Sequence, residues 1–382
     1  MKGQTGMYHL ISHKLFDIVQ NEENSHAGSE IYLERCLELA QHAKGHTAPN
    51  PMVGALLVYN ERVIGEGWHH EHGAAHAEVA CLENVAAADK HLIPESTMYV
   101  NLEPCAHHGH TPPCAVRLVK ERVKKIVIAN VDPFDKVSGK GIEILKHGGV
   151  EVEAGIMYRE GLWLNRRFFC FHTHRRPYVI LKWAQTLNGY IAPADRSRFQ
   201  ITGGASRQLV HKWRTEEAAI MVGAATARND NPELTARLWS GKQPLRIVLD
   251  RNLTLPRHHH LFNNTAPTWI VNELEESASG NVAYVKLPFG DTLLPNLMER
   301  LFKAKILSLI VEGGAALLES FMHLGLWDEA RIFTGAMNLA NGLPAPVLKN
   351  GTLAFTQKME QDNLGVFVNK DSIYPYAGGM DL

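Results

Sequence analysis

The amino-acid sequence predicts an α/β protein with two domains. Its 382 residues are enough for two hydrophobic cores of ordinary size. Short apolar segments of strand length alternate with segments of helical periodicity along the chain, which is typical of sheets covered by helices. The alternation restarts near residues 172–177, and neither half repeats the motifs of the other. We therefore expect a fusion of two different domains, at 29–174 and 175–382, after an N-terminal extension at 1–28.

The first domain is expected to open with a helix at 30–45, which Ser29 can cap and Gly45 can end. The segment 50–68 then predicts two strands around a turn at Asn60–Glu61. The elements expected after them are a helix at 76–88, a strand at 97–103, a helix at 114–122, a strand at 124–131, a helix at 139–148, a strand at 150–155 and a helix at 158–172.

The second domain is expected to open with the continuous apolar run YVILKWA at 178–184, which predicts a strand buried on both faces. Further helices are expected at 204–217, 293–304 and 315–325, and further strands at 218–224, 245–250, 268–272, 306–314 and 329–335.

Composition and charge exclude several classes of protein. The formal net charge is −1, which gives no general electrostatic attraction to nucleic acid or to an anionic membrane. No apolar run approaches the roughly 18 residues of a membrane span, and the apolar stretch KLFDIV near the N-terminus is too short for a signal peptide and contains Asp17. Five scattered cysteines do not make a disulfide framework. We expect a cytoplasmic protein without nucleic-acid or membrane partners.

A constellation of metal-ligand residues lies in the first half, in HAEV (76–79) and EPCAHHGHTPPC (103–114). His76, Cys105 and Cys114 offer one imidazole and two thiolates, which are good zinc ligands. Three protein ligands leave the fourth tetrahedral position open to water, as in a catalytic site. Glu78 would reach that water without being a ligand, an arrangement used by zinc deaminases as H-x-E followed by P-C. The pattern predicts a zinc-dependent deaminase.

Other interpretations stay open at this point. A structural zinc site, or a zinc-stabilised binding module without catalysis, would need a fourth ligand from His107, His108 or His110. A deaminase acting on nucleic acid or a free base would need a basic stripe or stacking aromatic residues. The remaining cysteines are expected to be small buried apolar residues: Cys36, Cys81 and Cys170.

Three blocks of the first half resemble the deaminase half of the bifunctional riboflavin-biosynthesis deaminase–reductase family. They are TAPNPMVG at 47–54, HAE at 76–78 and EPCAHHGHTPPC at 103–114, whose eight residues between the cysteines differ from the usual P-C-x-x-C of deaminases. The resemblance covers residues 29–172. It implies a cytidine-deaminase-like three-layer α/β/α fold and a diaminopyrimidinone substrate that carries a phosphoribosylamino group. It implies substrate contacts by Asn50, His69 and His110, the last standing where the family commonly has Arg or Lys.

The second half resembles the reductase half of the same family, which has a dihydrofolate-reductase-like fold and uses NADPH. The similar segments are KWAQTLNGYIA (182–192), SRFQIT (197–202), RTEEAAIMVGAATARNDNPELTAR (214–237) and VEGGAAL (311–317). The chain lacks the G-x-G-x-x-G motif there, so a classical Rossmann domain is not expected. Two departures from the family are Asn188 in place of Asp and the missing Trp in SRFQIT.

The resemblance also implies the residues of the reductase site. Those expected to hold NADPH are Ala184, Gln200, Thr226, Asp230, Gly314, Ala315, Ala316, Leu317, Leu318, Glu319 and Ser320. Those expected to hold the substrate are Ser197, Arg198, Arg214, Leu234, Arg237 and Glu312. The implied function is hydrolytic deamination with zinc followed by reduction of the ribosyl chain with NADPH, and we expect a homo-oligomer, either a dimer or a tetramer.

Overall fold

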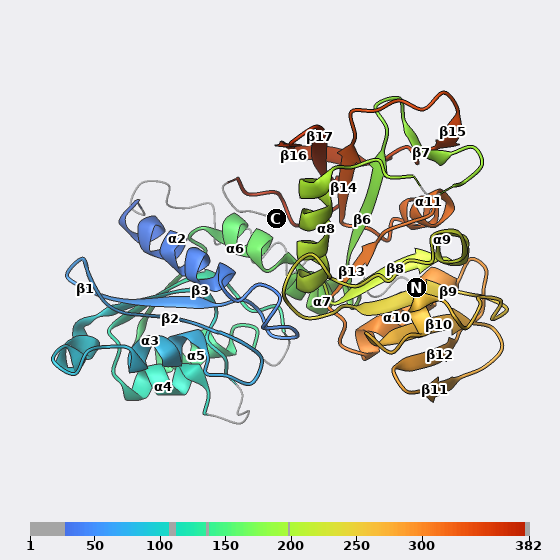
Figure 1. Cartoon of the computed structure of the whole chain (residues 1–382). Coiled ribbons are helices and arrows are strands. Elements are labelled where there is room, and N and C mark those ends of the chain that lie inside the picture. The colour runs from blue at the N-terminus through green and yellow to red at the C-terminus, as the bar shows by residue number, and fades with distance from the viewer. Residues whose placement is uncertain (1–26, 107–111, 135–136, 198, 379–382) are drawn as a thin grey trace. The chain divides into compact units, whose positions relative to one another are not determined.

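The computed structural model describes residues 27–106, 112–134, 137–197 and 199–378. The chain divides into two compact units, Met1–Asn165 with Ala377–Leu382, and Arg166–Tyr376. In Figure 1 the main part of the first unit is coloured from blue to green and the second from green to red. The sequence placed the division between residues 174 and 175, whereas the contacts within each unit place it nine residues earlier.

The first unit is built on a five-stranded sheet in the order β2-β1-β3-β4-β5. Strand β1 is antiparallel to β2 and β3, and β3, β4 and β5 are parallel. Helices α2 and α6 cover one face, and α3, α4 and α5 cover the other (Figure 1). The elements are α2 (Ala27–Gln41), β1 (Gly54–Tyr59), β2 (Arg62–Trp68), α3 (Ala77–Glu83), a 3₁₀ helix (Lys90–Glu95), β3 (Thr97–Leu102), α4 (Cys114–Lys120), β4 (Lys125–Asn130), α5 (Lys140–His147), β5 (Glu151–Ala154) and α6 (Tyr158–Leu164). The three-layer α/β/α prediction is confirmed.

Two glycines of β2 determine how closely α3 approaches the sheet. A Cβ atom at Gly67 would lie 2.4 Å from the backbone nitrogen of Cys81, and one at Gly65 would lie 2.7 Å from the Cys81 carbonyl oxygen. Contacts this short are impossible for a real side chain, so only glycine lets α3 lie directly on β2. This close packing fixes the start of α3, where His76 stands as the N-cap residue.

The single helix expected at 158–172 is two helices, α6 and α7 (Arg166–His174), with a break at Asn165. The side chain of Asn165 explains the break, because its Oδ1 accepts a hydrogen bond from the Met52 backbone nitrogen and its Nδ2 donates to the Met52 carbonyl oxygen, both at 2.8 Å. Asparagine competes well for backbone groups in this way. The last residue of the first unit is thus fastened to the loop before β1.

The second unit contains a ten-stranded sheet in the order β11-β12-β10-β9-β8-β13-β6-β14-β17-β16. The seven neighbouring strands from β12 to β14 in this order are parallel. The pairs β11–β12, β14–β17 and β17–β16 are antiparallel. The elements of the second unit are α7, β6 (Tyr178–Gln185), β7 (Tyr190–Pro193), α8 (Gly204–Glu216), β8 (Ala219–Gly223), α9 (Ala224–Asp230), β9 (Leu245–Leu249), a 3₁₀ helix (His260–Phe262), β10 (Thr268–Asn272), β11 (Ser277–Ser279), β12 (Val282–Lys286), α10 (Leu293–Lys303), β13 (Ser308–Val311), α11 (Ala315–His323), β14 (Glu329–Thr334), β15 (Gly342–Pro344), β16 (Gly351–Met359) and β17 (Asp362–Asn369). The sequence did not predict the three strands that follow β14.

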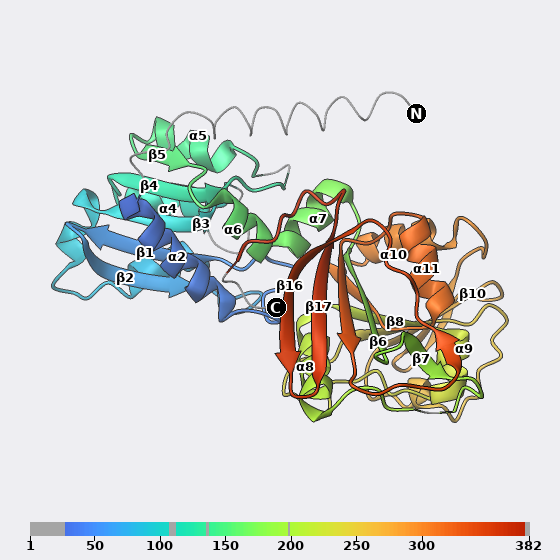
Figure 2. The same ribbon diagram turned by 90° about the horizontal axis from the view of Figure 1, so that it is seen from above.

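Helices cover both faces of this sheet, as the apolar run of β6 predicted. Ala330 and Ile332 of β14 face the main core cluster, together with leucines of α10 and α11. Because side chains alternate along a strand, Arg331 and Phe333 face the other side. There Phe333 lies 5.6 Å from the ring of Trp213 in α8, and the Arg331 guanidinium lies over the same ring at 4.4 Å. Figure 2 shows β16 and β17 at one end of the sheet.

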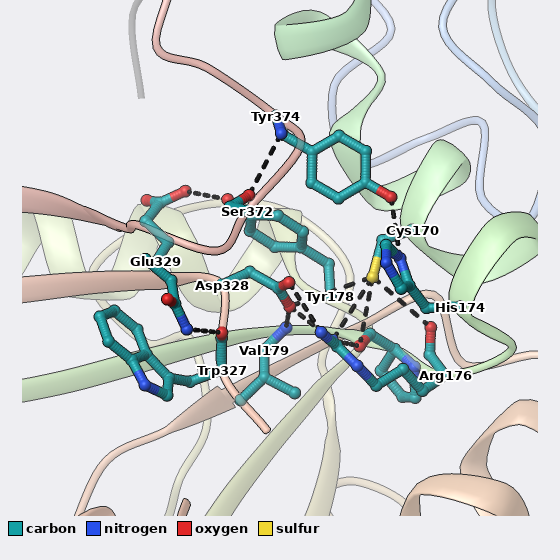
Figure 3. A network of polar contacts seen from close by, with 12 residues as sticks. Cys170, His174, Arg176, Tyr178, Val179, Trp327, Asp328, Glu329, Ser372 and Tyr374 are labelled. Atoms are coloured by element: carbon teal, nitrogen blue, oxygen red, sulfur yellow. Dashed lines mark hydrogen bonds and ion pairs between the residues drawn. The ribbon is translucent and has the colours of Figure 1, made fainter. Parts of the chain in front are cut away.

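A polar network fastens the first and last segments of the second unit to its central strands (Figure 3). Asp328 accepts hydrogen bonds from two nitrogens of Arg176 at 2.6 and 2.8 Å and from the Val179 backbone nitrogen at 2.8 Å. Tyr374, which is fully buried, pairs through its hydroxyl with His174 Nδ1 at 3.1 Å. Such pairs are costly to break because each partner would remain buried without the other.

Among the described residues, no helix is both long and apolar enough to cross a membrane.

Candidate metal centre and candidate reductase site

The three predicted metal ligands come together in the first unit. His76 precedes α3, Cys105 follows β3, and Cys114 is the first residue of α4. The Cys105 and Cys114 sulfurs lie 3.6 and 3.3 Å from His76 Nδ1, and the three ligand atoms all lie within 4.8 Å of one another. One imidazole nitrogen and two sulfurs converging on a point form a donor set that fits zinc with one position left open.

Contacts within this cluster favour the thiolate form of Cys105 but not that of Cys114, because the hydrogen bond with Cys105, together with burial, raises the pKa of the Cys114 thiol. A hydrogen bond with Cys114, supported by one with His76, lowers the pKa of Cys105 to about 4. The same contact with Cys105 raises the pKa of His76 to about 9. The thiolate is the form that binds metals, and a metal must displace the proton of the imidazole, so loading releases protons.

Glu78 lies on the second residue of α3 and is buried, only 4% exposed. Burial raises its pKa, and the neighbouring His76 opposes that shift. A buried carboxyl group with a raised pKa is suited to accept a proton and to donate it again in general acid–base catalysis. Glu78 thus lies close to the predicted ligand His76, as expected for the predicted acid–base residue.

The predicted substrate residue His69 lies next to the predicted ligand His76 and contacts the second predicted substrate residue, Asn50. The ring of His69, which is buried, packs edge-on against the ring of His76 with 5.4 Å between centroids. Its Nδ1 pairs with the Ala75 carbonyl oxygen at 3.0 Å, and its Nε2 pairs with Asn50 Nδ2 at 3.1 Å. Burial lowers the pKa of His69. A neutral His69 that donates from Nδ1 accepts at Nε2 from Asn50, so the amide of Asn50 is oriented beside the ligand cluster.

Glu103 belongs to the EPC motif, although the sequence predicted no role for it. In the structure its side chain binds backbone groups that follow β4. Its buried carboxylate accepts hydrogen bonds from the backbone nitrogens of Asp132, Gly139, Gly141 and Ile142 at 2.9 to 3.2 Å. Four donors satisfy a buried carboxylate. Because Glu103 lies two residues before Cys105, this anchor fixes the backbone that carries a ligand.

Some predicted residues lie outside the described part of the chain. They are His110 and Arg198, together with His107 and His108, which were considered as a fourth ligand.

In the second unit, a buried ion-pair cluster joins three elements. Glu312, which directly follows β13, binds Arg214 of α8 through two hydrogen bonds of 2.9 and 2.7 Å. Lys182 of β6 lies 3.6 Å from the same carboxylate. Burial alone would raise the pKa of Glu312, but Arg214 and Lys182 outweigh it and lower the pKa to about 2. The cluster therefore places a fixed carboxylate between two cations, and Lys182 is a member that the sequence did not predict.

The predicted substrate residues Leu234 and Arg237 lie in the segment between α9 and β9. Leu234 is buried and has a φ angle of +53°, a conformation that costs free energy in a branched residue. The Arg237 side chain is about half exposed and pairs with Glu233 at 3.0 Å. The Arg214 Nη1 donates to the Thr235 carbonyl oxygen at 3.0 Å, so this segment and the ion-pair cluster are directly connected.

Two predicted cofactor segments also meet. Thr226 of α9 accepts a hydrogen bond at 3.0 Å from the backbone nitrogen of Gly314, which precedes α11. Gly313 and Gly314 have φ angles of +151° and +35°, which favour glycine and leave the start of α11 without side chains in front of it. Backbone N–H groups at the start of a nine-residue helix suit a phosphate group, so this turn fits a phosphorylated cofactor.

The other cofactor positions are placed less directly. Leu317 and Leu318 belong to the main core cluster, so only their backbone could contact a cofactor. Ala315, Ala316, Glu319 and Ser320 complete the first turns of α11, and the Ser320 hydroxyl donates to its own helix at the Ala316 carbonyl oxygen. Ala184 lies on β6 opposite Phe333, and Asp230 ends α9.

Ser197 and Gln200 lie in the exposed loop between β7 and α8. The Ser197 nitrogen donates to Asp195, Gln200 Nε2 donates to the Thr202 carbonyl oxygen, and Gln200 Oε1 accepts a hydrogen bond of 3.3 Å from Arg207 of α8. The structure does not bring these two side chains into the ion-pair cluster. Both residues belong to the segment SRFQIT, which has no periodic pattern of apolar residues and therefore predicts neither a helix nor a strand.

Comparisons with known proteins agree with both halves. Residues 27–130 match the family of the cytidine and deoxycytidylate deaminase zinc-binding region, and residues 177–352 match the RibD C-terminal domain family. The riboflavin biosynthesis protein RibD of Aquifex aeolicus is 38% identical over 82% of this chain and 88% of its own length, and that of Escherichia coli is 34% identical over 80% and 86%.

Solved structures agree as well. A diaminohydroxyphosphoribosylaminopyrimidine deaminase/5-amino-6-(5-phosphoribosylamino)uracil reductase of Thermotoga maritima superposes with a TM-score of 0.82 at 32% identity, over 90% of this chain and 99% of that one. One crystal form of Acinetobacter baumannii RibD superposes with a TM-score of 0.81, also at 32% identity and over 90% and 99% of the two chains.

Fold and ligand geometry thus define a zinc-dependent deaminase joined in one chain to an NADPH-using reductase of the RibD C-terminal type. The chain belongs to the RibD family of riboflavin biosynthesis proteins, and its deaminase and reductase domains act in that pathway.

Proposed function

We propose that this chain deaminates 2,5-diamino-6-(5-phosphoribosylamino)pyrimidin-4(3H)-one and then reduces 5-amino-6-(5-phosphoribosylamino)uracil to the ribitylamino product. The two reactions correspond to the activities in the name of the Thermotoga maritima protein. The observation that carries the proposal is the convergence of His76, Cys105 and Cys114 with the buried Glu78 beside them.

In the deaminase domain, His76, Cys105 and Cys114 would hold zinc, which supplies Lewis-acid activation of water when bound. Glu78 takes a proton from the attacking water and delivers it to the amino group, which leaves as ammonia while the ring carbon gains an oxygen. Asn50, oriented by His69, binds the polar edge of the pyrimidine. We also assign His110, which lies outside the described residues, to the substrate phosphate.

In the reductase domain, NADPH supplies the hydride. Thr226, Asp230 and the turn and helix start at 314–320 bind the cofactor, with Ala184 and Gln200 at its other contacts. Arg214 has its orientation fixed by Glu312 and, with Arg237, binds the phosphorylated ribose chain, because a guanidinium group matches the geometry of a phosphate. Leu234, Ser197 and Arg198 complete the substrate contacts in this proposal.

Two assays on one preparation test the proposal. Purified protein should contain about one zinc per chain, release ammonia from the diaminopyrimidinone, and consume NADPH when given the deaminated intermediate. The Cys105→Ser variant should lose zinc and ammonia release while retaining NADPH consumption. Undiminished zinc in this variant would remove Cys105 from the ligand set, and wild-type protein without ammonia release would refute the deaminase assignment.

We also infer a cytoplasmic homo-oligomer, either a dimer or a tetramer. All five cysteines are free, as suits a reducing compartment. Strand β16 ends the ten-stranded sheet and exposes Leu353, and such an edge can pair with another chain. Light scattering coupled to size-exclusion chromatography would measure the assembly, and a monomer at micromolar concentration would contradict this inference.

A further inference from the structure

The segment 234–237 of the reductase domain is held in place by side chains. Its residues belong to neither α9 nor β9, so their backbone groups have no partners in a regular element. The Thr235 carbonyl oxygen accepts from Arg214. Gln243 pairs with both the nitrogen and the carbonyl oxygen of Ala236, at 2.7 and 3.3 Å. Backbone groups this well buried need partners, so each of these side chains helps to define the position of the segment.

His211 supplies the partner of the last residue. Its Nδ1 accepts a hydrogen bond of 2.9 Å from the backbone nitrogen of Arg237. His211 lies on α8 three residues before Arg214, so the two side chains leave the same face of the helix, one turn apart. One face of α8 therefore contacts both the Thr235 carbonyl oxygen and the Arg237 nitrogen.

The acceptor role requires a neutral imidazole, with its proton on Nε2. The surroundings enforce this form. His211 is buried, and burial together with the charges of Arg214, Arg237 and Lys182 lowers its pKa to about 4, while Glu312 opposes part of this shift. The imidazole is therefore an acceptor throughout the neutral pH range.

We propose that His211 is a positioning residue of the reductase, which fixes the Leu234–Arg237 segment, and with it the Arg237 guanidinium, against the substrate's phosphorylated ribose chain. The inference rests on the proposed function for the identity of that substrate. His211 acts through the backbone of Arg237, and its contribution is to substrate binding.

The test compares variants that differ in where they offer an acceptor. The Oδ1 atom of asparagine is as far from the backbone as Nδ1 of histidine, whereas the amide of glutamine lies one bond further out. His211→Asn should keep the KM for the deaminated substrate within about threefold of wild type. His211→Gln and His211→Leu should raise that KM by about 10-fold, because the partly buried backbone nitrogen of Arg237 loses its acceptor. The kcat at saturation should change by less than about threefold.

Three measurements separate this role from a general loss of stability. Calorimetric titration of the deaminated substrate without NADPH should show the same order of affinities as the KM values. Ammonia release by the other domain should be unchanged in every variant. Ser206→Ala is the matched control, because it removes a buried 2.6 Å hydrogen bond to Asp362 from the same helix without touching the segment. It should leave the KM unchanged.

The outcomes distinguish a failure of the proposed function from a failure of the proposed role of His211. Wild-type protein that consumes no NADPH with this substrate would refute the proposed function itself. An active wild type together with unchanged KM in both His211→Gln and His211→Leu would overturn the role of His211. Equal losses in His211→Asn, His211→Gln and Ser206→Ala would also overturn it, since they would show only a weakened fold.

Discussion

The metal centre and the reductase cluster both hold ionisable side chains that are partly or wholly shielded from water, but they do so in different ways. The predicted metal ligands come from a short stretch, in which Cys114 lies 38 positions after His76, and two of them stand at helix starts. The reductase cluster joins Arg214 and Glu312, which are 98 residues apart, and satisfies them with each other and with Lys182. The first site is incomplete until a metal binds, whereas the second is already paired and needs substrate only to complete its contacts.

This difference predicts how each site responds to the loss of one charge. At the metal centre, the ion dominates the local electrostatics, so removing a neighbouring carboxylate should change the chemistry and leave the site assembled. In the reductase cluster, each charge is the principal partner of another, so removing one should disturb the remaining pair.

The largest expected effect is in Glu78→Gln. Ammonia release should fall by about 10²- to 10⁴-fold, because the amide cannot carry the proton from water to the leaving group. Zinc content should remain near one per chain, since Glu78 is not a ligand, and NADPH consumption with the deaminated intermediate should stay within about twofold. Elemental analysis and the two assays would measure these quantities. Loss of zinc would show instead that Glu78 is a ligand, and loss of both activities in folded protein would show that the domains share one active site.

A smaller effect is expected from Arg214→Met. Removing one partner of a buried, hydrogen-bonded charge pair costs about 2–5 kcal/mol, so the reductase kcat/KM should fall by about 30-fold or more while ammonia release is unchanged. Arg214→Lys keeps the charge but loses the two-point contact with Glu312, and its loss should be intermediate.

The Arg214→Met substitution should also change the pH dependence of the reductase kcat/KM. Burial favours the protonated form of Glu312, and in the wild type the charges of Arg214 and Lys182 overcome it and hold the pKa near 2. Without Arg214 the pKa of Glu312 must rise, so the acid limb of kcat/KM should move to higher pH in Arg214→Met. Identical pH profiles in wild type and Arg214→Met would contradict the dependence of Glu312 on this pair.

The amount that the sequence predicted also differs between the sites. His76, Cys105, Cys114 and Glu78 were predicted from residue types and spacing, because few side chains bind zinc and their order is restrictive, and the structure brings the three predicted ligands together. The alternation of strands and helices likewise predicted most of both sheets. Arginine, lysine and glutamate are common on surfaces, so Arg214 and Glu312 were predicted only through family resemblance and Lys182 was not predicted.

The contacts that the sequence could not show are those made to the backbone. Nothing in a single sequence says that Glu103 accepts four backbone N–H groups, or that His211 accepts one from Arg237. The strands β16 and β17 were missed, because β16 is a largely exposed edge strand without a continuous apolar run. The break at Asn165 was missed because a single asparagine does not interrupt helical periodicity.

The smallest expected effect concerns Asn188, which stands where the family has aspartate. The structure gives the amide a structural role: Nδ2 donates to the Leu339 carbonyl oxygen at 2.7 Å, and Oδ1 accepts from the Leu339 nitrogen at 3.2 Å and from Thr186 Oγ1 at 2.8 Å. In Asn188→Asp the donor is lost and a carboxylate oxygen faces the Leu339 carbonyl oxygen. Because this site is exposed, the free energy of unfolding should fall by only about 1 kcal/mol, which corresponds to roughly 2–4 °C in the Tm of the reductase domain. The reductase kcat/KM should change by less than about threefold, as measured by NADPH consumption. A tenfold or greater gain in kcat/KM would show that a negative charge at this position takes part in the reaction, and that the asparagine is a functional departure from the family as well as a structural one.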